Sequence, residues 1–105
     1  MKAAIKKKWI AALRSGKYKQ TYWELRYNDQ FCVLGVLCDI VAPKLWRHSS
    51  KSCTAYWKHD GVVRFPTSSV FKKSGLSKFD AADISNFNDA GVSFEKLAGI
   101  IEKKL

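Results

Sequence analysis

The sequence contains one long, almost entirely apolar segment, FCVLGVLCDIVA, at residues 31–42. Twelve residues is long for a strand and Pro43 stops a helix, so this segment predicts a mostly buried helix over about residues 32–42. Gly35 lies inside the helix and would let another element approach its backbone closely. We therefore expect this helix to form the centre of the core, with the other elements packed around it.

The length of 105 residues predicts a single domain, residues 1–105, that buries roughly two thirds of the surface of its unfolded chain. Such a domain folds without a metal ion or a disulfide. The sequence has no apolar run of about 18 residues, so no membrane-spanning helix is expected. Charged residues interrupt the apolar positions of the N-terminus, which is unlike the apolar part of a signal peptide.

Two elements are predicted before the apolar segment. Residues 3–14 are expected to form a helix that ends at Ser15-Gly16 and has one apolar face, made by Ile5, Trp9, Ala12 and Leu13. Residues 21–27, TYWELRY, predict a half-buried strand with Trp23, Leu25 and Tyr27 on one face. Residues 28–30, Asn-Asp-Gln, are expected to form a turn.

The elements after the apolar segment are a hairpin and three short helices. Asp60-Gly61 separates two β-rich runs, residues 52–58 and 62–65, which predicts a hairpin. Pro66 is expected to begin a short helix that Gly75 closes, and Asp80 to cap a second helix that reaches Phe87.

Residues 88–91 are expected to form a turn, and Ser93 to cap the last helix. The apolar stripe of that helix is Phe94, Leu97, Ala98, Ile101 and Leu105. Together these elements predict an α+β fold: an N-terminal helix, a small antiparallel sheet, a buried central helix and a helical C-terminal third.

The net charge is +10, from 19 Lys and Arg residues against 9 Asp and Glu residues, and it is unevenly distributed. Residues 1–26 carry eight basic groups and one acidic group, whereas residues 80–105 carry three basic groups and five acidic groups. A basic surface concentrates anions, which include nucleic acids, nucleotides, phospholipids and acidic protein surfaces.

The cysteines do not indicate catalysis. Cys32 and Cys38 are six residues apart on the predicted helix, too far for a disulfide, and their neighbours are apolar, as around a buried thiol. A nucleophilic cysteine would need His48 or His59 as a base in a polar, open setting. A zinc site would draw on residues whose spacing matches no finger or knuckle: Cys32, Cys38, His48, Cys53 and His59. We expect no metal ion, no cofactor and unreactive thiols.

Acidic residues do not form an evident catalytic pair. Asp80 and Asp83 share a helix face, but they suit the cap and the first turn of a helix. Asn88 and Asp89 suit a structural role, in which their side chains bond backbone amides at a turn, and a ligand contact is the alternative. We therefore expect no enzymatic activity; a small hydrolase or nuclease is the remaining enzymatic alternative.

Basic and aromatic residues are interleaved in two places, within residues 14–26 and around the predicted hairpin. Cations neutralise phosphate and aromatic rings stack on bases, which is how proteins bind single-stranded nucleic acid or nucleotides. The alternative is that Tyr18 and Trp23 belong to the core and the lysines only face water. With the Asn-Asp pair, the candidate ligand- or partner-binding residues are Arg14, Lys17, Tyr18, Lys19, Tyr22, Trp23, Arg26, Arg47, Trp57, Lys58, His59, Asn88 and Asp89.

Three blocks of the sequence resemble a family of small uncharacterised proteins of tailed phages and prophages. The blocks are ALRSGKYKQ at residues 12–20, FCVLGVLCD at residues 31–39 and FNDAGVSFEKLAGIIE at residues 87–102, with FPTSSVFKKSGL at residues 65–76 as a looser fourth. The family commonly has adjacent cysteines where this chain has Cys32-Val33, and a leucine where it has Phe87. The resemblance implies an accessory gene product that binds a host factor or a host signal.

These observations together predict a small phage-type accessory binding protein with a counter-defence or host-modulating role. Its target would be anionic, either a nucleotide signal or an acidic host protein surface, held by the basic and aromatic residues. The alternative is a nucleic-acid-binding module. With an odd number of cysteines and no export signal, we expect a cytoplasmic protein, in the host cytoplasm if a phage encodes it, with no membrane partner. Homo-oligomerisation is left open.

Overall fold

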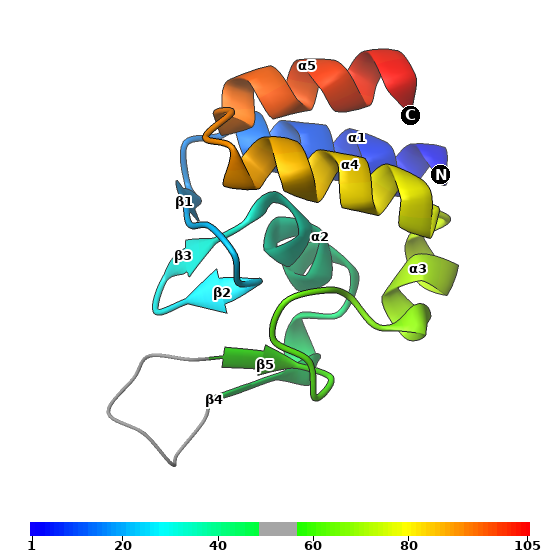
Figure 1. Ribbon diagram of the computed structural model, residues 1–105. Helices are drawn as coiled ribbons and strands as arrows, with labels where there is room; N and C mark the ends of the chain where they lie inside the picture. Colours follow the sequence, from blue (N-terminus) through cyan, green and yellow to red (C-terminus); the bar gives the residue numbers. More distant parts are fainter. Residues whose placement is uncertain (49–56) are drawn as a thin grey trace.

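Helix α2 (Val33–Val41) lies at the centre of the molecule, as the apolar segment predicts (Figure 1). The computed structural model describes residues 1–48 and 57–105. Six residues of α2, from Val33 to Cys38, are buried. Helices α1, α3 and α4 all contact α2, so the core forms around this segment. The α+β fold class is confirmed.

The remaining elements are short and follow one another closely along the chain. The helices are α1 (Ala3–Arg14), α3 (Ser68–Ser74), α4 (Lys78–Asp89), α5 (Phe94–Lys104) and the 3₁₀ helix η1 (Pro43–Leu45). The strands are β1 (Lys19–Gln20), β2 (Arg26–Tyr27), β3 (Gln30–Phe31), β4 (Trp46–His48) and β5 (Trp57–His59). In residues 1–48 and 57–105, no helix has both the length and the hydropathy needed to cross a membrane.

The predicted role of Gly35 is confirmed. A Cβ atom at this position would overlap the backbone carbonyl of Leu25, which passes directly over α2. Leu25 is itself fully buried, and its carbonyl accepts a hydrogen bond from the Cys32 amide at 3.1 Å. Only glycine lets these two backbone segments lie so close together.

The chain ends lie on one side of the molecule, where α1 and α5 pack side by side (Figure 1). The predicted apolar faces are confirmed: Trp9 and Leu13 of α1 are buried, as are Leu97 and Ile101 of α5. The indole Nε1 of Trp9 donates to the carbonyl of Val33 at 3.0 Å, which ties α1 to the first turn of α2.

Two of the predicted helix boundaries in the C-terminal third are confirmed, whereas α3 begins at Ser68 rather than at Pro66 and α4 continues to Asp89 rather than to Phe87. Gly75 closes α3 with a φ of 73°, and the Ser93 hydroxyl caps α5 by accepting from the Lys96 amide. The predicted cap at Asp80 is wrong, because Ser77 caps α4 and its hydroxyl accepts from the Asp80 amide at 3.1 Å. The helix therefore begins three residues earlier in the chain.

The predicted strand over residues 21–27 is wrong in its first five residues. Only Arg26 and Tyr27 form a strand, and Trp23 has a φ of 70°, outside the β region. The predicted turn at residues 28–30 is confirmed in its first two residues, since Asn28-Asp29 joins β2 to β3. A three-stranded sheet results, in the order β1-β3-β2, with β1 parallel and β2 antiparallel to β3.

The predicted hairpin is replaced by another pairing. Strand β5 pairs with β4, which precedes it, rather than with residues 62–65. Asp60 and Gly61 both have positive φ and do turn the chain, but they lead only to a single bridge between His59 and Val62. Residues 52–56 of the predicted first strand lie outside the described residues.

Candidate functional site

Arg26 bridges the two sheets, and most of its side chain is covered. Its guanidinium lies 3.8 Å from the ring centre of Trp57, and the rings of Phe31 and Trp46 lie further off, at 4.9 and 5.5 Å. Its Nε donates to the Asn28 carbonyl at 2.8 Å, and only 16% of the side chain is exposed. This cation stabilises the packing of β2 and β3 against β5 by cation–π interaction.

Strands β4 and β5 form a ribbon with one aromatic face and one basic face. On the first face Trp46 packs edge-on against His59, and His48 packs edge-on against Trp57. On the other face Arg47 and Lys58 are exposed and lie directly opposite each other. The ring of Trp57 is therefore covered by Arg26 and His48, and it does not stand beside the exposed cations.

His59 lies inside the protein, which rules out a ligand contact at the surface. Its ring is fully buried, and Nε2 lies 2.8 Å from the carbonyl of Ala42. Nδ1 has no hydrogen-bond partner within the described residues. The predicted binding role of His59 is thus replaced by a packing role beside Trp46.

Tyr18 is also held within the protein. Its hydroxyl donates to one oxygen of Asp39 at 2.6 Å, and the indole Nε1 of Trp46 donates to the other oxygen at 3.0 Å. Its ring packs edge-on against Phe31, with centroids 5.1 Å apart. Burial and the hydrogen bond to Asp39 raise the pKa of Tyr18 to about 12.

The late ionisation of Tyr18 is a testable consequence. Its folded pKa is raised, so between pH 10 and about pH 12 the unfolded chain loses this proton while the folded protein keeps it. The free energy of unfolding should therefore decrease as the pH rises through this range, and less so in a Tyr18→Phe variant. The difference between the tyrosinate absorbance of the two proteins gives the pKa of Tyr18 directly. A difference curve centred at pH 10 would contradict the hydrogen bond between Tyr18 and Asp39.

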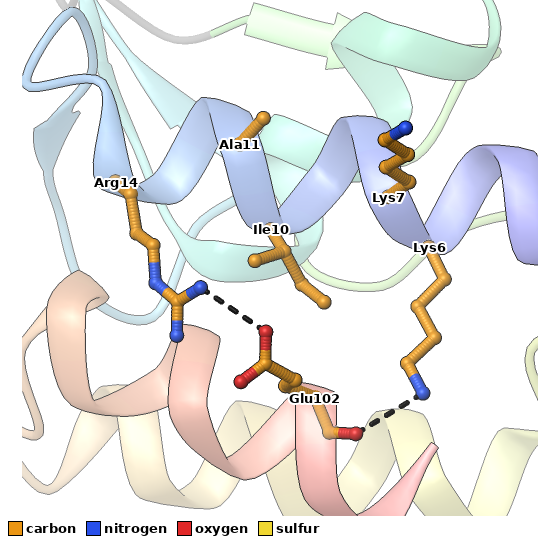
Figure 2. Close-up of a pocket in the computed structure, with 6 residues that line it drawn as sticks. All are labelled: Lys6, Lys7, Ile10, Ala11, Arg14 and Glu102. Carbon is orange, nitrogen blue, oxygen red and sulfur yellow. Dashed lines mark hydrogen bonds and ion pairs between the residues drawn. The ribbon is translucent and has the colours of Figure 1, made fainter.

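Arg14 lies at the edge of a groove between α1 and α5, with a volume of about 370 Å³ (Figure 2). Arg14 and Lys6 point from α1 toward Glu102 of α5, on either side of Ile10. The guanidinium lies 3.2 Å from a carboxylate oxygen of Glu102, and the Lys6 ammonium donates to the backbone carbonyl of the same residue at 3.2 Å. Arg14 thus joins two helices and does not belong to the loop that follows α1.

The exposed face of the three-stranded sheet carries one row of polar and aromatic side chains. The register places Lys19 beside Gln30 and Gln30 beside Tyr27, and all three are exposed. Neighbouring strands lie about 4.8 Å apart, so Lys19 and Tyr27 stand about 10 Å apart on this face. Lys17, two residues before Lys19, is exposed as well.

The segment between β1 and β2, residues 21–25, presents two aromatic rings to solvent. Tyr22 is exposed, and 67% of Trp23 is exposed. A φ of 70° is unfavourable for a bulky L-residue and costs on the order of 1–3 kcal/mol. The Trp23 amide donates to a carboxylate oxygen of Asp89 at 2.9 Å, which helps to hold this conformation. We call residues 21–25 the Trp23 loop.

Asn88 connects the end of α4 to both the Trp23 loop and α2. Its side chain is fully buried, and its amide nitrogen donates to the carbonyl of Thr21 at 3.0 Å and to Asp89 at 3.2 Å. Its oxygen accepts from the Val33 amide at 3.1 Å and from the side chain of Gln20 at 3.0 Å. The predicted turn at residues 88–91 is corrected accordingly: Asn88 and Asp89 end α4, and their bonds reach distant segments.

Four of the predicted residues, Lys17, Lys19, Tyr22 and Trp23, are thus exposed on neighbouring segments of the chain. Together with Tyr27, which takes the place of Arg26, we call them the basic–aromatic surface. Asn88 and Asp89 hold the Trp23 loop of this surface through their hydrogen bonds to Thr21 and Trp23. Gln20, which also donates to the Val92 carbonyl at 2.7 Å, completes the support. Neither Gln20 nor Tyr27 was a candidate. For Gln20 the reason is that no local pattern in the sequence shows that residue 20 contacts residue 88.

The cysteines of α2 are unreactive in this setting. Cys32 caps α2, its sulfur accepting from the Gly35 amide at 3.3 Å, and Cys38 is fully buried. Burial raises the pKa of Cys32 to about 12 and raises the pKa of Cys38 further. In the part of the chain that the structure describes, no group of three His, Cys, Asp or Glu side chains could hold a metal ion. Cys53 lies outside that part.

We expect both α2 thiols to alkylate slowly. Iodoacetamide needs a thiolate that solvent can reach, so the folded protein should react about a hundredfold slower at Cys32 and Cys38 than the denatured chain. Mass spectrometry of the digested protein reads each cysteine separately. Labelling at the rate of the denatured chain would contradict their burial.

A family model described as a domain of unknown function, DUF8296, matches residues 1–77. The matched range runs from α1 to the cap of α4, so it includes the whole basic–aromatic surface but not Asn88 and Asp89. No curated protein and no solved structure matches the chain. Since the model covers well over half of its residues, the chain belongs to the DUF8296 family.

Proposed function

We propose that the protein is a non-enzymatic binding protein whose basic–aromatic surface docks on an acidic region of another protein. The observation that carries this proposal is the conformation of Trp23. A large aromatic side chain is held in solvent, on a strained backbone, by a hydrogen bond from its own amide to Asp89 and by the bond from Asn88 to the neighbouring Thr21 carbonyl. Strain of this kind persists where the surrounding structure enforces it, and it is concentrated at functional sites.

The chemistry of the surface favours a macromolecular partner over a free nucleotide. Small ligands are usually enclosed in a pocket that covers most of their surface. Here Tyr22 and Trp23 stand on a loop and Tyr27 on an open sheet face. Aromatic anchors surrounded by a polar rim are typical of protein interfaces, and the positive charges of Lys17 and Lys19 on that rim would favour an acidic partner.

Single-stranded nucleic acid is the second candidate. The same three rings offer stacking platforms for bases, and the two lysines lie within reach of phosphates. A nucleic acid would be bound with an affinity that falls steeply with salt, because each neutralised phosphate releases a counterion.

The resemblance to small proteins of tailed phages suggests the biological setting of this proposal. In that setting the acidic partner is a host protein, the role is counter-defence or host modulation, and the protein acts in the host cytoplasm. The net charge of +10 supports electrostatic attraction to such a partner.

The proposal is tested by reversing the charge of the surface. A Lys17→Glu/Lys19→Glu variant should bind fluorescein-labelled poly-glutamate about tenfold more weakly than the wild type in fluorescence anisotropy, because rim charges are lost. A Lys72→Glu/Lys73→Glu variant is the matched control, since it has the same net charge and both lysines are exposed on α3. Equal weakening in the two variants would show that only net charge matters and would overturn the assignment of the surface.

The same titration with labelled oligo-dT separates the two candidates. A nucleic-acid-binding protein should bind oligo-dT more tightly than poly-glutamate at low salt and lose that affinity as salt rises. Absence of binding to oligo-dT at low salt would exclude the second candidate.

A further inference from the structure

The outer side of α4 exposes two phenylalanines. Phe79 is 86% exposed and Phe87 is 40% exposed. They lie eight residues apart with Asp83 midway, and residues four apart in a helix share a face. The side chain of Phe79 therefore buries little apolar area within its own chain, and together with Phe87 it leaves this side of α4 apolar.

A hollow of about 230 Å³ lies between α4 and α5, beside this side of α4. Ile84, Phe87, Ile100 and Leu105 supply its apolar lining. Its two rims carry opposite charges, with Asp83 on α4 and Lys104 on α5. Neither of these two residues takes part in the ion pairs found among residues 1–48 and 57–105.

We propose that this α4–α5 face is the interface of a homodimer in which Phe79 of each copy packs into the hollow of the other. The interface of a two-fold dimer is formed by one surface that meets itself, so that surface must contain both a projection and a recess that receives it. Phe79 is the projection, and the hollow between α4 and α5 is the recess.

The antiparallel arrangement of α4 and α5 also brings opposite charges together in such a dimer. Helices α4 and α5 run in opposite directions side by side, so the start of α4 lies near the end of α5 (Figure 1). A two-fold axis parallel to these helices places α4 of one copy over α5 of the other, so that the start of α4 meets the end of the second copy's α5. Asp83 then faces Lys104 of the second copy, and Phe79 faces Ile100 and Leu105 of that copy.

This self-complementarity is the reason to choose a second copy as the partner. A uniformly acidic partner would meet Asp83 unfavourably, and a uniformly basic one would meet Lys104 unfavourably. Phe79 lies at the start of α4, whereas the Trp23 loop is attached to Asp89 at the end of that helix. Substitution of Phe79 therefore tests the dimer without altering the residues of the basic–aromatic surface.

Sedimentation velocity at increasing protein concentration, up to about 1 mM in about 0.15 M salt, tests the dimer. The wild type should shift from the mass of one chain to twice that mass. A Phe79→Ser variant should stay monomeric over the whole range, while its melting temperature changes little because this side chain is exposed. A wild type that stays monomeric at every concentration would overturn the proposal.

Charge swaps test the orientation of the two copies. Asp83→Lys and Lys104→Glu should each weaken the dimer about tenfold or more, because each places like charges opposite one another. The double variant restores opposite charges in the proposed arrangement and should recover association. A dimer that survives Phe79→Ser, or a double variant that associates no better than either single variant, would show that another face is used.

Discussion

Replacing Gly35 by alanine is expected to destabilise the protein by about 3–5 kcal/mol, in the range of the largest single-residue effects. The added Cβ would overlap the Leu25 carbonyl, and backbone atoms cannot move aside as a flexible side chain can. Leu25 is fully buried and α2 is the central helix, so the strain reaches the whole core. Urea denaturation followed by circular dichroism measures this change.

Gly99→Ala is the matched control for this substitution. Gly99 lies within α5, and a Cβ at this position would meet no other atom. Alanine should therefore stabilise the protein by about 0.5–1 kcal/mol through its higher helix propensity. A Gly35→Ala variant as stable as the wild type would mean that α2 and Leu25 do not pack as closely as the structure shows.

Replacing Asn88 by alanine is expected to destabilise the protein by about 3 kcal/mol. The substitution leaves the buried Val33 amide and the Thr21 carbonyl without partners, and each unsatisfied group costs about 1–3 kcal/mol. The Trp23 loop also loses its attachment to α4, so binding through the basic–aromatic surface should weaken together with stability. Denaturation and the poly-glutamate titration measure the two effects on one sample.

Asn86→Ala controls for a change of the same residue type in the same helix. Asn86 is exposed, so its replacement should change the free energy of unfolding by less than about 0.5 kcal/mol. If Asn88→Ala were equally harmless, the side chain would not hold the Trp23 loop. The role assigned to the end of α4 would then be wrong.

The helices could be predicted from the sequence because each of them has its own local signal. The apolar run before Pro43 predicts α2, Gly75 marks the end of α3, and Ser93 marks the start of α5. The α4 cap shows the limit of such signals, because Ser77 and Asp80 are both good capping residues and only the structure distinguishes them.

The strands could not be predicted in the same way, because their pairing depends on distant contacts. The composition of residues 21–27 is that of a strand, yet Asp89 and Asn88 hold residues 21–23 in a loop. Likewise Asp60-Gly61 turns the chain as expected, but β5 finds a better partner in β4 because Trp46 and Trp57 then pack with Arg26. Tertiary contacts decided both outcomes.

The candidate site could likewise be predicted only in part from the sequence. The interleaved basic and aromatic residues of the sequence predict a binding region, but they do not show which rings face solvent. Trp57 and Tyr18, two of the candidate residues, pack inside, whereas the candidate Trp23 is exposed. The amide of Trp23, which has a positive φ, donates to a residue 66 positions away, and the sequence holds no local signal of such a bond.

The most direct test of the proposed function compares the wild type with a Trp23→Ser variant in affinity capture from a bacterial lysate at low salt. Phe79→Ser serves as the control, because it also removes an exposed aromatic ring but leaves the basic–aromatic surface intact. We predict that acidic proteins retained by the wild type and by Phe79→Ser are lost with Trp23→Ser. Retention of the same proteins by all three would contradict a binding role for the Trp23 loop.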